Sequence, residues 1–149
     1  MTSSRLGLLL IVALAIGWAH GEARVWGAPA SERALTKKEV VDLYEGKSWL
    51  WEKGVGFFAT KSQFNAFSGE GKDRSTAAGS WEALDDGRLC FSGVWTTKAW
   101  RRFARTCFAH KIKDGQIYQR RLPKGEWYIF RHDPEQEGDQ KLVTGDQTR

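Results

Sequence analysis

The chain has 149 residues and a formal net charge of +5, and 41% of its residues are hydrophobic. These values fit one ordinary soluble domain and leave no room for a multidomain enzyme. Eight tryptophans and eight phenylalanines supply enough apolar surface for a packed core, which excludes a disordered or low-complexity chain.

The N-terminus has the pattern of a secretory signal. Arg5 precedes an apolar run from Leu6 to Trp18, and Ala19-His20-Gly21 then offers a small-x-small cleavage site. A membrane anchor would need about 20 apolar residues, and this run is shorter. We therefore predict a signal peptide over 1–21, a periplasmic or secreted protein, and no stable membrane insertion after cleavage.

The segment that follows is predicted to be a linker leading to one short helix. Residues 22–34 contain Gly and Pro and show no apolar period. Thr36 with Glu39 forms a capping-box pattern, and Gly46 supplies the residue type that ends such a helix. A single β-rich domain over 35–132 is expected to begin there.

After Gly46 the apolar period changes to two residues, and hairpin signals separate short runs rich in aromatic residues. Eight strands are predicted, near Lys47–Glu52, Val55–Thr60, Gln63–Ser68, Ala77–Leu84, Arg88–Thr97, Phe103–Lys113, Gln116–Leu122 and Glu126–Arg131. The predicted fold class is mainly β, an antiparallel meander preceded by the helix.

Closure of this meander would remove unpaired strand edges, so a small closed barrel is favoured. The alternative is a half-open barrel in which the helix plugs one mouth. The polar, aperiodic residues 133–149 predict a disordered tail.

The two cysteines, Cys90 and Cys107, predict one disulfide, because an exported chain with an even cysteine count is usually oxidised. A thiol catalyst or a metal pair is the alternative, but His110 is the only imidazole close to either in sequence. If the cysteines are directly opposite on neighbouring antiparallel strands, Val94 faces Phe103. The segment 96–102 would then be the loop.

Several blocks carry a resemblance to a known family. They are Leu43-Tyr44-x-Gly46-Lys47-x-Trp49-x-Trp51, Gly79-Ser80-Trp81, Gly87-Arg88-Leu89-Cys90-Phe91, Thr106-Cys107-Phe108 and Tyr118-Gln119-Arg120-Arg121-Leu122-Pro123. With these blocks the chain resembles the bacterial family DUF995. The resemblance implies a small exported protein of alphaproteobacteria, and it brings no reaction or catalytic residues.

Arginines and aromatic residues alternate in the last third of the domain. The candidate ligand-binding residues are Trp100, Arg101, Arg102, Arg105, Tyr118, Arg120 and Arg121. Such residues can stack on sugars and pair with anions. The simpler explanation is a solvated strand surface. No nucleic-acid partner is expected, because the compartment and the small positive charge both argue against it.

No pattern in the sequence indicates catalysis, a metal or a cofactor. His110 and His132 are interpreted as structural, and Asp85-Asp86 belongs to a hairpin turn. The tryptophans are expected to fill the barrel rather than to line a cavity.

Three functions remain open at this level. The first is a non-catalytic binding module for an envelope glycan, an anionic amphiphile or an envelope protein. The second is an inhibitor or assembly factor that presents a rigid loop to a protein partner, and the third is a small hydrolase. A closed apolar cavity would favour the first, a protruding loop the second, and converging titratable groups the third.

Overall fold

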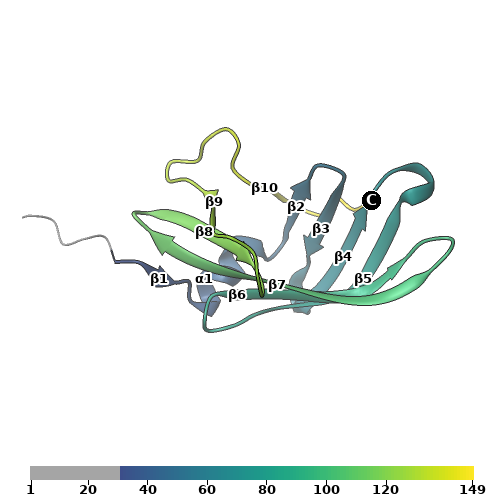
Figure 1. Cartoon of the computed structure of the whole chain (residues 1–149), viewed down its shortest axis with the longest axis horizontal. Helices are drawn as coiled ribbons and strands as arrows, with labels where there is room; N and C mark the ends of the chain where they lie inside the picture. The colour runs from purple at the N-terminus through teal and green to yellow at the C-terminus, as the bar shows by residue number, and fades with distance from the viewer. Residues whose placement is uncertain (1–30) are drawn as a thin grey trace, which may run out of the picture.

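The computed structural model describes residues 31–149, in which a strongly curved antiparallel sheet wraps around one short helix (Figure 1). The predicted signal peptide and most of the predicted linker lie outside these residues. No helix in the described part is long and apolar enough to cross a membrane.

The elements follow one another with short connections. They are β1 (Arg33–Ala34), α1 (Lys37–Tyr44), β2 (Lys47–Trp51), β3 (Gly54–Phe58), β4 (Gln63–Ser68), β5 (Ser75–Ala83), β6 (Arg88–Thr96), β7 (Arg101–Lys113), β8 (Gln116–Arg121), β9 (Tyr128–Arg131) and β10 (Lys141–Thr144). The eight predicted strands correspond to β2 through β9, so the mainly β meander is confirmed.

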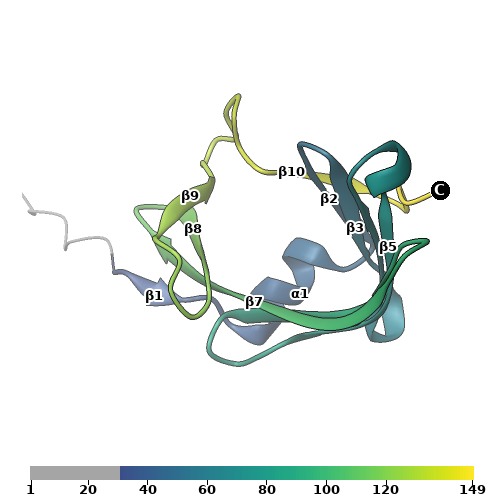
Figure 2. The same cartoon turned by 45° about the vertical axis from the view of Figure 1, so that its right-hand side comes forward.

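The sheet forms a half-open barrel rather than the favoured closed one. Its order is β10-β2-β3-β4-β5-β6-β7-β8-β9, and no ladder joins β9 to β10. One backbone hydrogen bond, from the nitrogen of Gln140 to the oxygen of Phe130 at 3.0 Å, links the two sides. The helix α1 lies within the curve of the sheet (Figure 2), so part of the interior is filled without complete closure.

The helix begins as predicted. The Oγ1 atom of Thr36 accepts from the nitrogen of Glu39 at 3.2 Å, and the Glu39 carboxylate accepts from the nitrogen of Thr36 at 2.7 Å. A hydrogen bond from Arg33 and the backbone of Thr36 lower the pKa of Glu39 to about 2. The opposite side of α1 is apolar, and Val40 and Tyr44 are fully buried there.

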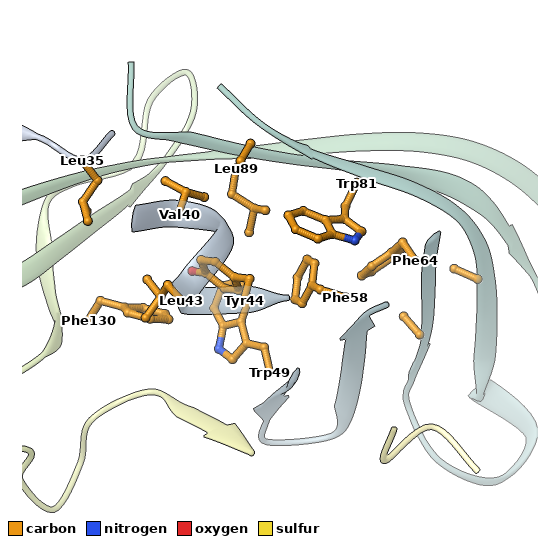
Figure 3. Packing of buried hydrophobic residues seen from close by; sticks show 13 residues of the cluster. Leu35, Val40, Leu43, Tyr44, Trp49, Phe58, Phe64, Trp81, Leu89 and Phe130 are labelled. Atoms are coloured by element: carbon orange, nitrogen blue, oxygen red, sulfur yellow. The ribbon is translucent and has the colours of Figure 1, made fainter. Parts of the chain in front are cut away.

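The core lies between α1 and the concave face of the sheet (Figure 3). The Tyr44 ring packs edge-on against Phe58, with ring centroids 5.0 Å apart, and lies 5.8 Å from Phe130. Trp49 also packs against Phe130, at 5.6 Å. The helix, the first strands and β9 are therefore joined by one aromatic cluster.

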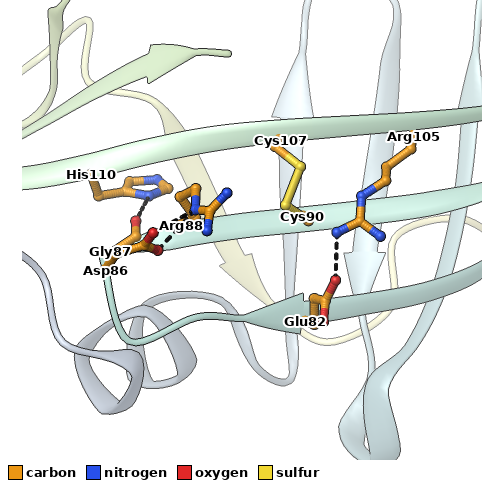
Figure 4. The surroundings of a disulfide bond; sticks show 8 residues. All are labelled: Glu82, Asp86, Gly87, Arg88, Cys90, Arg105, Cys107 and His110. Carbon is orange, nitrogen blue, oxygen red and sulfur yellow. Dashed lines mark hydrogen bonds and ion pairs between the residues drawn. A yellow bond between two sulfur atoms is a disulfide. The ribbon is translucent and has the colours of Figure 1, made fainter. Parts of the chain in front are cut away.

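The predicted disulfide register is confirmed. Cys90 and Cys107 face each other on β6 and β7 with Cα atoms 4.1 Å apart, and they are disulfide-bonded (Figure 4). Val94 faces Phe103 in the same ladder. The connecting loop is shorter than the predicted 96–102, because Thr96 already pairs with the first residue of β7.

The prediction of a disordered tail over 133–149 is wrong from Lys141 onward, where β10 forms. Strand β10 adds to the free edge of β2. The Ser48 hydroxyl donates to the oxygen of Gly145 at 2.7 Å and accepts from the nitrogen of Gln147 at 3.0 Å. The physical reason is that β2, at the end of the meander, has backbone groups that need partners.

The predicted linker also contributes to the sheet. Arg33 and Ala34 form β1, which pairs with Ile112 and Lys111 of β7. Strand β6 ends before this point, since its first residue, Arg88, pairs with Ala109. Strand β1 therefore pairs with the same edge of β7 as β6 does, at the residues beyond the end of β6.

Candidate functional site

Aromatic side chains from distant strands meet on the concave face. Alternation places Trp49 and Trp51 of β2 on one face, and the β6–β7 register places Phe91, Trp95 and Phe108 on the same face. They border a groove of about 410 Å³, which we call the aromatic groove. Its lining consists of Trp49, Trp51, Ser68, Phe91, Trp95, Thr106, Phe108 and Arg121.

The rings of the aromatic groove are fixed by their packing. The Trp49 and Phe108 centroids are 5.1 Å apart at a steep angle, and Trp49 also contacts Trp51 at 6.4 Å. Phe91 stacks on the buried Phe64 at 4.6 Å. Because buried core residues pack against these rings, the groove has a preformed apolar wall.

Positive charge lies at the edge of this wall. Arg121 of β8 faces Phe108, and Arg102 of β7 faces Trp95, so each guanidinium shares the concave face with a groove residue. Both arginines are exposed. Neither takes part in an ion pair within residues 31–149. A planar guanidinium in this setting can pair with a carboxylate or phosphate oxygen.

Comparison with known proteins places the chain in a family. The family model described as a protein of unknown function, DUF995, matches residues 9–148. The chain belongs to the DUF995 family. The match confirms the resemblance seen in the Trp-rich blocks and extends through β10. Neither the curated proteins nor the solved structures contain a match to it.

The seven candidate binding residues of this DUF995 chain do not form one site. Arg120 faces Ala109 whereas Arg121 faces Phe108, so the two neighbours point to opposite faces of the sheet. Tyr118 shares the outer face with Arg120. Because consecutive strand residues alternate in direction, Arg120 and Arg121 do not share one binding face.

The remaining candidates also separate. Arg101 and Arg105 lie on the outer face of β7, and Arg105 pairs with Glu82 at 2.6 Å. Trp100 lies in the β6–β7 loop, and the Arg102 guanidinium is 5.4 Å from the centroid of its ring. Of the seven, Arg102 and Arg121 are on the face that carries the aromatic groove.

A buried polar network lies beside the groove in the core. The Nδ1 atom of His110 is 2.9 Å from the oxygen of Gly87, which can only accept, so Nδ1 carries the proton. Its Nε2 then accepts from the Tyr44 hydroxyl at 2.9 Å, while Gln119 donates to the Tyr44 oxygen at 2.7 Å. The hydroxyl of Tyr128 donates to the Oε1 atom of Gln119.

Burial lowers the pKa of His110 to about 4, so the ring is neutral near pH 7. With both nitrogens hydrogen-bonded and 1% of the residue exposed, His110 has the structural role that the sequence predicted. His132 has a different partner, Asp139, with Nδ1 and Oδ1 2.6 Å apart. In the part of the chain that the structure describes, no group of three or more His, Cys, Asp or Glu could hold a metal ion.

The aromatic groove was not predicted from the sequence. Most of its lining comes from β2, β6 and β7, and β2 lies near the other two strands only because the sheet curls. Trp49 does fill the core as predicted, but Trp51 and Trp95 are half-buried and line the groove. The signal available in the sequence was the spacing of two between Trp49 and Trp51, which puts both rings on one face.

Proposed function

We propose that this chain is an exported, non-catalytic binding domain whose aromatic groove takes an anionic amphiphile. The observation that carries the proposal is the preformed aromatic wall with Arg121 at its edge. Binding sites of this kind combine mostly apolar walls with a few polar groups that fix the orientation of the ligand.

The lining of the groove favours an amphiphile over a purely polar ligand. An acyl chain or flat ring system would cover the exposed parts of Trp51 and Trp95, where apolar burial stabilises by about 25 cal/mol per Å². The anionic head would pair with Arg121 or Arg102. A neutral glycan could also stack on tryptophan, but it carries no negative charge to pair with the guanidinium groups of Arg121 and Arg102.

We expect Arg121→Gln to weaken the binding of dodecanoate by about tenfold, since a hydrogen bond to a charged group is worth roughly 1.5–3 kcal/mol. Uncharged dodecanol should bind the variant and the wild type equally. Tryptophan fluorescence reports both titrations directly, because three tryptophans line the groove. The loss for dodecanoate should shrink at high salt.

Matched variants separate the groove from general surface charge. Arg101→Gln removes the same charge on the outer face and should leave binding unchanged. Trp95→Leu should weaken both ligands, whereas Trp100→Leu, in the loop, should weaken neither. If dodecanoate does not bind, or if the two arginine variants lose equal affinity, the amphiphile proposal is wrong. Tight binding of a neutral oligosaccharide instead would identify a glycan site.

Export is the second element of the proposal and rests on the pattern of residues 1–21. Mass spectrometry of protein recovered from the periplasm is expected to find an N-terminus near Glu22 or Arg24. An Ala19→Leu variant removes a small residue from the small-x-small site, so signal peptidase should not cleave there and the N-terminus should be longer. Recovery of intact Met1 from the wild-type periplasmic fraction would contradict export with cleavage.

One observation favours the alternative function, a factor that presents a hairpin to a protein partner. Phe103 is 66% exposed, and Trp100 is 44% exposed, at the end of the β6–β7 hairpin. Val94 lies opposite Phe103 and is also exposed. This apolar patch lies outside the aromatic groove, so Phe103→Ser would disrupt a protein contact there and spare amphiphile binding.

A further inference from the structure

A second cavity lies on the outer face of the sheet, where β1 runs beside β7. Its volume is about 640 Å³, and its walls come from β1, the turn before β6, β7, β8 and the segment before β9. Four cationic side chains line it: Arg33, Arg88, Lys111 and Arg120. The aromatic groove is on the concave face, so the two cavities are separated by the sheet itself.

Most of these cations are already neutralised by the chain. Arg33 pairs with Glu39 at 2.7 Å, Arg88 with Asp86 at 2.7 Å, and Lys111 with Glu32 at 2.8 Å. Arg120 differs from the other three. Among the described residues it takes part in no ion pair, and its buried Nε atom has no hydrogen-bond partner.

Trp127 holds Arg120 close to a second cation. The guanidinium carbon of Arg120 is 5.0 Å from the centroid of the Trp127 ring, and the Lys111 ammonium is 4.5 Å from the same centroid. The aromatic face attracts both groups, yet like charges held on one ring repel each other. An anion that contacts both side chains would offset this repulsion.

We propose that this outer cavity binds a small oxyanion, with Arg120 as its main anchor and Lys111 as its second ligand. The Glu32 carboxylate, 2.8 Å from Lys111, is an internal competitor for the same cation. When a ligand displaces Glu32, Lys111 is freed beside the already unpaired Arg120, and two positive charges then face the ligand. A dianion, either a phosphate monoester or a dicarboxylate, matches that charge.

The test titrates the oxidised protein with inorganic phosphate, glycerol phosphate and succinate, by calorimetry in a buffer that contains no other oxyanion. Arg120→Gln is expected to weaken binding by about tenfold, the loss of a charge-assisted hydrogen bond. Glu32→Gln should strengthen binding several-fold, since it removes the competing carboxylate without touching the cations. Simple weakening of the fold would not produce opposite effects in these two variants.

The control is Arg101→Gln, which removes one positive charge from the far end of the same outer face. Equal losses in Arg101→Gln and Arg120→Gln would show diffuse surface attraction and overturn the proposal, as would an absence of binding by both the wild type and Glu32→Gln. If Arg120→Gln unfolds, Arg120→Lys, which keeps the charge but not the forked guanidinium donors, must still show the loss. A preference between phosphates and succinate identifies the headgroup. These outcomes are independent of dodecanoate binding, so either site can fail alone.

Discussion

Replacement of both Cys90 and Cys107 by serine is expected to lower the free energy of unfolding by about 3 kcal/mol. The two residues are 17 positions apart, and the bond restricts a loop of this size in the unfolded chain. For a domain of this length the loss corresponds to a fall in the midpoint of thermal unfolding of roughly 10 °C. The fold itself should persist, because β6 also pairs with β5 from Leu89 to Thr96, and β7 also pairs with β8 from Phe108 to Lys113.

Circular dichroism during heating measures this effect. Reduced wild-type protein is the better control, since it loses the bond without any change of side chain, and its midpoint should fall by a similar amount. The serine variant should fall slightly further, because Cys90 is buried and a serine hydroxyl there would need a partner. An unchanged midpoint after complete reduction would show that the disulfide does not stabilise the domain.

The second large effect is a loss of stability as the pH falls from 6.5 toward 4. Burial lowers the pKa of His110 from 6.5 to about 4. In this window the unfolded chain binds a proton that the folded chain does not, so acid favours unfolding. Each pH unit is worth about 1.4 kcal/mol, which gives a total of about 3 kcal/mol for this one side chain.

Denaturant unfolding at several pH values measures this slope. Above pH 6.5 His110 is neutral in both states and contributes no slope. The lowered pKa of Glu39 affects stability only below its ordinary value of 4.5. The change in the free energy of unfolding between pH 6.5 and 4.5 is therefore assigned to His110. His110→Gln should abolish the slope in that interval, although it also lowers stability at neutral pH. A wild-type free energy of unfolding that is flat over this interval would contradict the protonation state assigned to the network.

The strands of the meander could be predicted because their signals are local. Hairpin turns such as Asp86-Gly87 and Asp114-Gly115 fix where each strand ends, and two cysteines opposite each other fixed the β6–β7 register. Strands β1 and β10 could not be predicted in this way. Each pairs with a strand distant in the sequence, and their two and four residues are too few to show an apolar period.

The candidate site was predictable only in part. Alternation alone already separates Arg120 from Arg121, so their opposite faces could have been read from the sequence once β8 was placed. The contact between Trp49 and Phe108 could not, because β2 and β7 are not neighbours in the sheet. Their rings meet at 5.1 Å only because the sheet curls, and the degree of curl depends on packing around α1.

The position of β10 also bears on how the domain assembles. Apart from the ladders of β1 and β10, every ladder joins strands that are consecutive in the chain. These hairpins can therefore form one after another with little cost in loop-closure entropy. Trp49 and Gln140, which are joined by a hydrogen bond at 3.1 Å, are 91 residues apart. The edge of β2 therefore stays unpaired until the end of the chain is in place, and until then it can pair with another molecule.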